Sequence, residues 1–188
     1  MKANNFADSI AQGENAGDDP IWEAAFRKAY PDLANITRTN GTPSFMPAQA
    51  AGIDWTLHLS SGQNVRVDRK ARSKSYPDFA LETHHVYASG RRSNSPGWMC
   101  KSLLIDVLAY GFMPERRVYL LPWLTLRGVW LERKAEWWRL ARAKRFGFSL
   151  CKAWNSRGEY WTHNLCVPRD TLLESIRDAM VVDVPEAA

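Results

Sequence analysis

Hydrophobic and polar residues alternate along two short segments in the first half of the chain. In segment 53–59 the odd positions carry Ile53, Trp55, Leu57 and Leu59, and the even positions carry Asp54, Thr56 and His58. In segment 64–70 the odd positions carry Val65, Val67 and Arg69, and the even positions include Arg66, Asp68 and Lys70. Because successive side chains of a strand point to opposite faces, this pattern predicts two strands that each have one largely buried face and one polar face.

A three-residue loop at 60–62 joins the two predicted strands. Its last residue, Gly62, suits the left-handed backbone conformation that closes a loop of this length. With this loop, Leu59 pairs with Gln63 and the polar faces of the two strands coincide. A two-residue loop would shift the pairing by one position and separate the polar faces, so the prediction depends on the loop.

The same register brings three charged side chains together. Asp54 is predicted to lie opposite Asp68, with Cβ atoms roughly 5 Å apart, and Lys70 follows two residues along the same face. Two carboxylates this close repel each other unless a cation lies between them, and oxygen ligands suit Mg²⁺ or Mn²⁺. A metal there can activate water for phosphodiester hydrolysis, and the ammonium can orient that water. The alternative is a surface hairpin with a Lys–Asp ion pair.

Asp54, followed by Asp68-Arg69-Lys70 on the next strand, resembles the motif of the PD-(D/E)XK nuclease superfamily, which includes many restriction endonucleases. Ile53 stands where the motif has proline. Further segments are similar to the superfamily's first helix (22–30), third strand (78–82), next helix (101–112) and a following strand (117–122). The resemblance spans roughly residues 20 to 175 and is strongest to small phage and bacterial members.

The resemblance implies an α/β fold with a restriction-endonuclease-like core, in which helices flank a mixed central β-sheet on both faces. It implies a Mg²⁺-dependent (or Mn²⁺-dependent) deoxyribonuclease in which Asp54 and Asp68 bind the metal and Lys70 positions or activates water. Glu23 corresponds to an acidic residue that some members place on the first helix, and Glu82 on a neighbouring strand is a further candidate for the site. The alternative is an inactive nuclease-fold protein that binds nucleic acid or another protein, or acts as an inhibitor, because fold and chemistry are separable.

Basic residues surround the predicted site. The net charge of +5 and a pI of about 9.2 favour an anionic partner, and DNA is the partner expected here. The candidate nucleic-acid contacts are Arg66, Arg69, Arg72, Lys74, Arg91, Arg92 and Lys101. The alternative is ordinary solubility charge.

Segment 124–148 is predicted to be one long helix or two in sequence, with either a DNA-facing or a solvated cationic face. A homodimer would suit cleavage of both DNA strands.

Chain length, composition and cysteine content limit the class of protein that the sequence can encode. With 188 residues and 45% hydrophobic content the chain is long enough for one globular domain. We expect a flexible arm at 1–19, a single domain at 20–180 and a tail at 181–188. Three cysteines without paired spacing, no signal-peptide pattern and no stretch of about 20 apolar residues indicate a cytoplasmic protein outside the membrane.

Four further segments complete the predicted element order. We expect a loop over 32–48, a helix over 103–110, a final strand over 160–168 and a closing helix over 170–180. His84 and His85 are adjacent on a predicted strand and should face opposite sides of it, so they cannot chelate one metal together.

Overall fold

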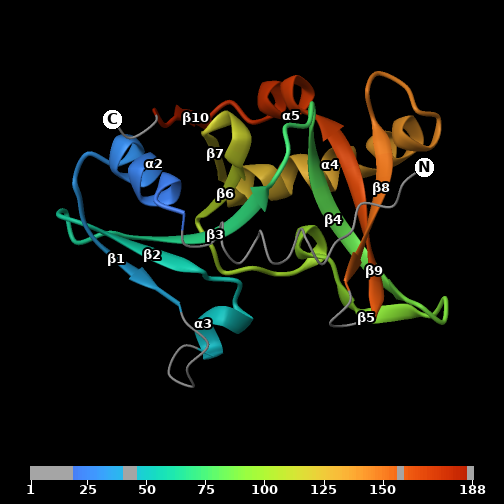
Figure 1. Ribbon diagram of the computed structural model, residues 1–188, viewed down its shortest axis with the longest axis horizontal. Coiled ribbons are helices and arrows are strands. Elements are labelled where there is room, and N and C mark those ends of the chain that lie inside the picture. The colour runs from blue at the N-terminus through green and yellow to red at the C-terminus, as the bar shows by residue number, and fades with distance from the viewer. Residues whose placement is uncertain (1–18, 40–45, 156–158, 186–188) are drawn as a thin grey trace. The chain divides into compact units, whose positions relative to one another are not determined.

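The computed structural model describes residues 19–39, 46–155 and 159–185. It is a mixed α/β protein whose described residues form two β-sheets and four α-helices (Figure 1). The chain divides into two compact units. One contains the six-stranded sheet and is built from 19–75, 102–126 and 178–185; the other contains the four-stranded sheet and is built from 76–101 and 127–177. No helix among the described residues is long and apolar enough to cross a membrane.

The six-stranded sheet has the order β1-β2-β3-β6-β7-β10. Its strands are β1 (Leu33–Arg38), β2 (Trp55–Leu59), β3 (Asn64–Arg72), β6 (Val107–Phe112), β7 (Arg117–Pro122) and β10 (Met180–Asp183). β3 and β6 run parallel, and the other neighbours run antiparallel. The short helices of this unit are α3 (Met46–Ala50) and the 3₁₀ turn η3 (Met113–Glu115).

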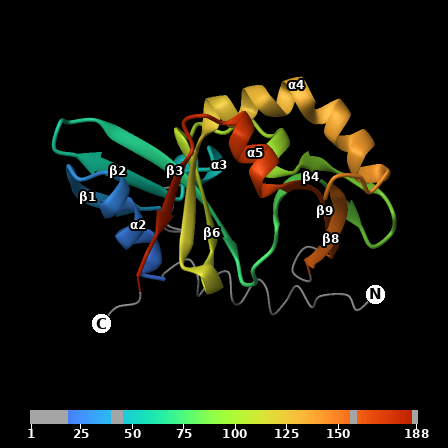
Figure 2. The same cartoon turned by 90° about the horizontal axis from the view of Figure 1, so that it is seen from above.

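The helix α2 (Ile21–Ala29) covers one face of this sheet (Figure 2). The side chain of Asp19 accepts the backbone N–H of Ile21 at 2.9 Å and so satisfies a donor at the start of the helix. Trp22 and Phe26 are buried against the odd-numbered side chains of β2, and the ring centroids of Phe26 and Trp55 are 5.6 Å apart. The helix therefore buries the apolar side chains that helical spacing places on one of its faces.

The hairpin of β2 and β3 has the predicted register. His58 pairs with Asn64, the backbone N–H of Leu59 donates to the carbonyl of Gln63 at 2.9 Å, and Gly62 has a φ of +86°. The backbone N–H of Gly62 donates to Leu59, which closes the loop. The predicted loop geometry is thus confirmed.

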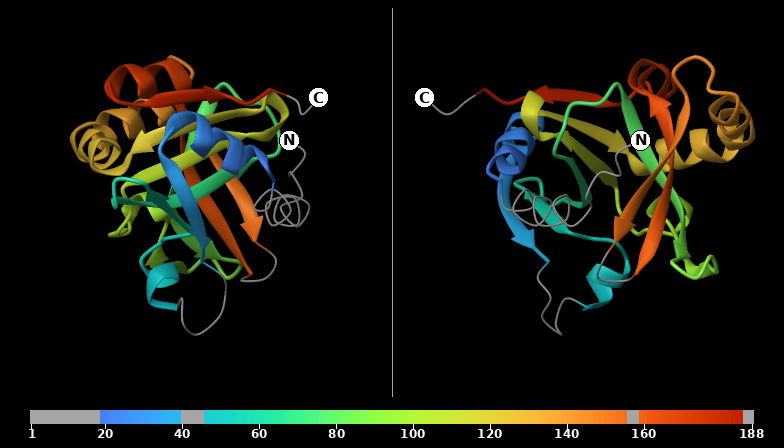
Figure 3. Two further views of the ribbon diagram at one scale, coloured as in Figure 1. Left: turned by 90° about the vertical axis from the view of Figure 1, so that its left-hand side faces the viewer. Right: turned by 45° about the vertical axis from the view of Figure 1, so that its right-hand side comes forward.

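The four-stranded sheet is antiparallel and has the order β5-β4-β9-β8. Its strands are β4 (Asp78–Tyr87), β5 (Arg92–Pro96), β8 (Ser149–Asn155) and β9 (Tyr160–Pro168), and Figure 3 shows β9 between β8 and β4. The helices of this unit are η2 (Trp98–Cys100), α5 (Arg169–Ser175) and most of α4 (Trp123–Arg142). The predicted final strand is confirmed.

Several predicted elements are wrong. The helix expected over 103–110 is replaced by the strand β6, whose residues are all buried, because a continuous apolar run does not distinguish a buried strand from a helix. The loop expected over 32–48 contains β1, and its residues 40–45 lie outside the described part. The closing helix expected over 170–180 ends at Ser175. Residues 180–183 form β10 at a sheet edge, where the end of that helix and the start of a tail were expected.

The strand expected at 78–82 exists as part of β4, but it belongs to the second sheet and not to the sheet that carries the hairpin. The mixed α/β class is confirmed, with two sheets where one central sheet was expected. Residues 1–18 of the predicted arm and 186–188 of the predicted tail lie outside the described residues.

Candidate functional site

The aspartates predicted to meet do meet in the six-stranded sheet. Asp54 directly precedes β2, and the register of Trp55 with Val67 places it across from Asp68 when continued by one position. The backbone N–H of Asp54 donates to the carbonyl of Val67 at 2.9 Å, and the backbone N–H of Arg69 donates to Oδ2 of Asp54 at 2.9 Å. Backbone contacts thus hold the Asp54 carboxylate at the end of the hairpin.

Asp68 is a buried carboxylate, with only 4% of the residue exposed. Lys70 lies two residues along the same face of β3, and its Nζ donates to Oδ1 of Asp68 at 2.6 Å. Burial raises the pKa of Asp68 to about 6, Lys70 opposes this rise, and the neighbouring Asp54 adds to it. The carboxylate pair is therefore a place where a proton or another cation is favoured.

Arg69 lies on the opposite face of β3 and turns toward α2. Its guanidinium carbon is 4.1 Å from the ring centroid of Trp55 and 5.7 Å from that of Trp22. Its Nε lies 3.9 Å from Oδ2 of Asp54, and only 15% of its side chain is exposed. Stacking on Trp55 holds the guanidinium of Arg69 close to Asp54. Arg69 therefore adds a fixed positive charge next to the carboxylate of Asp54.

Glu23, predicted as a helix carboxylate of the site, lies on the partly exposed side of α2. Its Oε1 accepts from the guanidinium of Arg27 at 2.8 Å, and its Oε2 is 3.7 Å from that of Arg38. Arg38 in turn lies 4.7 Å from the ring centroid of Trp55. Glu23 is thereby neutralised by two arginines, and its described contacts are with these arginines.

Asp106, which sequence reasoning missed, is a further carboxylate of this unit. It directly precedes β6 and accepts three hydrogen bonds from Arg66, namely from the backbone N–H (2.8 Å), Nε (2.9 Å) and a terminal guanidinium nitrogen (2.8 Å). Hydrogen bonding from Arg66 lowers the pKa of Asp106. The sequence signal for Asp106 was its position just before the apolar run 107–112, as Asp54 stands just before β2. Because 103–110 was expected to be a helix, Asp106 was not recognised as a residue at the start of a strand.

The acidic pair fits a divalent cation in its donor chemistry. Asp54 and Asp68 supply carboxylate oxygens, and Mg²⁺ in proteins is commonly held by one or two carboxylates with water completing its shell. No group of three or more His, Cys, Asp or Glu side chains suited to a metal ion occurs among the described residues. A metal held here would therefore depend on these two carboxylates.

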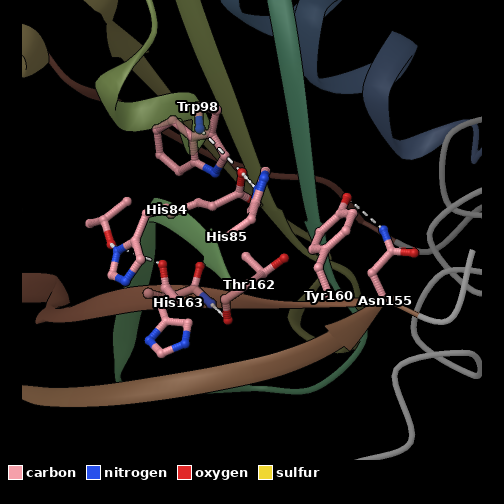
Figure 4. Close-up of polar contacts among 10 residues, drawn as sticks. His84, His85, Trp98, Asn155, Tyr160, Thr162 and His163 are labelled. Carbon is pink, nitrogen blue, oxygen red and sulfur yellow. Dashed lines mark hydrogen bonds and ion pairs between the residues drawn. The ribbon is translucent and has the colours of Figure 1, made fainter. Parts of the chain in front are cut away.

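Glu82, the other predicted carboxylate, belongs to the four-stranded unit. Its Oε1 is 2.9 Å from Nε2 of His85 and accepts the backbone N–H of Trp98 at 3.2 Å (Figure 4). His85 stacks on Tyr160 with ring centroids 4.5 Å apart, and the hydroxyl of Tyr160 accepts from Nδ2 of Asn155 at 2.8 Å. Glu82 thus contacts His85 and Trp98 directly, and His85 extends this polar cluster to Tyr160 of β9.

The two adjacent histidines face opposite sides of β4, as predicted. His84 stacks on His163, with ring centroids 4.5 Å apart, and His85 contacts Glu82 and Tyr160. Burial, reinforced by His84 and Lys152, lowers the pKa of His163 to about 4. The stacked pair of His84 and His163 is therefore favoured in its neutral form at neutral pH.

The predicted nucleic-acid contacts divide between the two units. Arg66 is bound to Asp106, Arg69 is stacked on Trp55, and Lys74 is exposed in the turn after β3. The others are placed as follows: Arg72 is half-buried at the end of β3, Arg91 is exposed over the Tyr87 ring, Arg92 is exposed at the start of β5, and Lys101 is half-buried after η2.

Comparisons with known proteins give no further assignment. No protein-family model, curated protein or solved structure matches the chain.

Proposed function

We propose that the protein is a metal-dependent nuclease of the PD-(D/E)XK type that hydrolyses DNA phosphodiester bonds. The observation that carries the proposal is that Asp54, directly before β2, lies across from Asp68 on β3, with the Nζ of Lys70 2.6 Å from Asp68. The order of α2, β1, β2 and β3, with the acidic residues on the last two strands or at their ends, supports the same assignment.

Each residue of the trio has a distinct role in this proposal. Asp54 and Asp68 hold a Mg²⁺ or Mn²⁺ ion, which when bound lowers the pKa of water and stabilises negative charge on the phosphate. Lys70 is anchored by Asp68 and directs its ammonium group to the attacking water or to a phosphate oxygen. The Arg69 backbone N–H fixes Asp54, so the ligand does not have to be ordered when the substrate arrives.

DNA is the proposed substrate because the chain is basic overall. The net charge of +5 favours a polyanion, and Lys74 is exposed two residues beyond the end of β3, the strand that carries Asp68 and Lys70. Arg66 contributes less to this attraction because Asp106 neutralises it.

The test is a cleavage assay with plasmid and short duplex DNA in Mg²⁺ or Mn²⁺, paired with titration calorimetry of Mn²⁺ against the DNA-free protein. The wild type should cleave and bind the ion, and Asp68→Asn should do neither. Asp183→Asn is the matched control, because this exposed carboxylate on β10 is paired with Arg117 away from the trio. Equal cleavage by wild type and Asp68→Asn would show that the acidic pair is not the reaction centre.

One observation favours a second function, a nucleic-acid-binding module without hydrolysis. The Nζ of Lys70 pairs directly with the buried Asp68 carboxylate at 2.6 Å, as it would in a purely structural ion pair. This function predicts DNA binding that weakens steeply with salt, no heat of Mn²⁺ binding and no metal-stimulated cleavage.

A further inference from the structure

A pocket of about 490 Å³ lies in the four-stranded unit, between α4 and the residues of β4, β5 and η2. The residues that define its character are Arg92, Cys100, Arg127, Lys134, Trp138 and Arg142. All of them belong to one compact unit, so the pocket is a feature of that unit alone. Its volume falls within the range of roughly 300–1,000 Å³ that is typical of small-molecule sites.

The charged side chains that line the pocket are all positive. Four of the ten lining residues are arginine or lysine, and none is aspartate or glutamate. Arg92, Lys134 and Arg142 are exposed, and Arg127 is held in place by donating to the backbone carbonyl of Met99. Cations gathered in a concavity without acidic partners in its lining focus a positive potential that attracts anions.

Two titratable groups of the lining respond to this potential. The pKa of His84 is lowered by burial and then by the charge of Arg92. The thiol of Cys100 has a pKa raised by burial, while Arg127 and Lys134 act in the opposite direction because they favour the thiolate. Burial is the larger cause of both pKa shifts, and for Cys100 it outweighs the opposing effect of the neighbouring cations.

An aromatic surface lies beside the cations. Trp138 is half-buried, and the guanidinium carbon of Arg142 is 5.7 Å from its ring centroid. Trp130 is buried and forms part of the wall. A tryptophan face next to phosphate-binding cations is the combination by which proteins hold unpaired nucleotides, since every base can stack on it.

We propose that this pocket binds a segment of single-stranded nucleic acid, with Lys134, Arg142 and Arg92 on its phosphates and a base against Trp138. An unpaired strand fits the observations better than a duplex, because a concave pocket with an aromatic wall requires a base that is free to leave its stack. DNA and RNA share this chemistry. The pocket does not depend on the proposed hydrolysis, because the acidic pair lies in the other unit.

The test is fluorescence anisotropy of labelled 12-nucleotide oligo(dT) and oligo(U) and of a 12-base-pair duplex, with EDTA present so that no metal-dependent step occurs. Replacing Lys134 and Arg142 together by alanine should weaken binding of the single strands about tenfold or more. The double variant Arg133→Ala with Arg139→Ala removes the same charge from exposed positions of α4 outside the lining, and should change the affinity about twofold or less. Equal losses in the two variants, or tighter binding of the duplex, would overturn the proposal.

Cys100 gives a readout at the pocket itself. It is exposed, whereas Cys166 is buried and Cys151 is half-buried, so a maleimide should modify Cys100 first. Saturating oligo(dT) should slow this modification at least fivefold in the wild type, and Trp138→Ala should remove most of the protection. Unchanged modification of Cys100 while oligo(dT) is bound would show that the strand lies elsewhere. Cleavage by the acidic trio is measured separately, so failure of one proposal leaves the other intact.

Discussion

The Nζ of Lys70 lies 2.6 Å from Oδ1 of Asp68, two residues away on the same face of β3. The contact joins a side chain that is 30% exposed to one that is 5% exposed, so the ammonium connects a buried carboxylate to the surface. This geometry serves catalysis if the lysine contacts a substrate, and it stabilises the carboxylate whether or not a substrate is bound.

Replacing Lys70 by alanine should reduce metal-dependent DNA cleavage by about 10²–10³-fold, the usual loss when one charge-stabilising donor is removed. Lys28→Ala is the control, since Lys28 donates to the backbone carbonyl of Asp183 at 3.0 Å and lies on α2. Plasmid nicking measures the rates, and circular dichroism establishes that both variants are folded. Comparable rates for Lys70→Ala and the wild type would remove Lys70 from the mechanism.

The raised pKa of Asp68 predicts a pH-dependent stability. A carboxyl group with a folded-state pKa of about 6 against an unfolded value of 3.8 binds its proton more tightly in the folded state. Its contribution is therefore fully present below pH 3.8 and is lost as the pH rises through 6. Between pH 5 and pH 8 the free energy of unfolding of the metal-free wild type should fall by about 1 kcal/mol relative to Asp68→Asn. Urea unfolding at the two pH values measures this, and parallel curves would contradict it.

Asp106 predicts the opposite pH dependence. Arg66 lowers the pKa of Asp106, so the stabilisation is fully present above the unfolded value of 3.8 and is lost as the pH falls from there through the lowered folded-state pKa. Because 39% of the Asp106 side chain is exposed, solvent screening limits the effect, and Asp106→Asn should cost about 1 kcal/mol at pH 7. Thermal unfolding at pH 7 and pH 3 measures this cost, which should be smaller at pH 3 than at pH 7. An equal cost at the two pH values would exclude an electrostatic origin.

Two glycines should respond in opposite directions to alanine. A Cβ on Gly97 would lie 2.5 Å from the backbone carbonyl of Glu82, so Gly97→Ala should destabilise the protein by about 1–3 kcal/mol. A Cβ on Gly128, within α4, meets nothing within 4 Å, so Gly128→Ala should stabilise the protein by up to about 1 kcal/mol. Chemical denaturation measures both. A neutral Gly97→Ala would show that η2 can move away from β4 without cost.

The sequence by itself determined the features that depend on neighbouring residues. Alternation along 53–59 and 64–70, with Gly62 in the loop, was sufficient to predict the register that brings Asp54 to Asp68, because a short hairpin leaves few alternatives. The stripe on α2 was equally predictable, since a period of 3.6 residues places Trp22 and Phe26 on one face.

Only the tertiary structure decided the features that depend on distant partners. Segment 107–112 is apolar throughout and is a strand because β3 and β7 pair with it on either side, which no local pattern encodes. The same pairing brings Asp106 to Arg66, and the assembly of the four-stranded sheet gives Glu82 its contacts with His85 and Trp98. The pocket beside Trp138 likewise joins residues from four separate elements, because burial and charge depend on which segments meet in space.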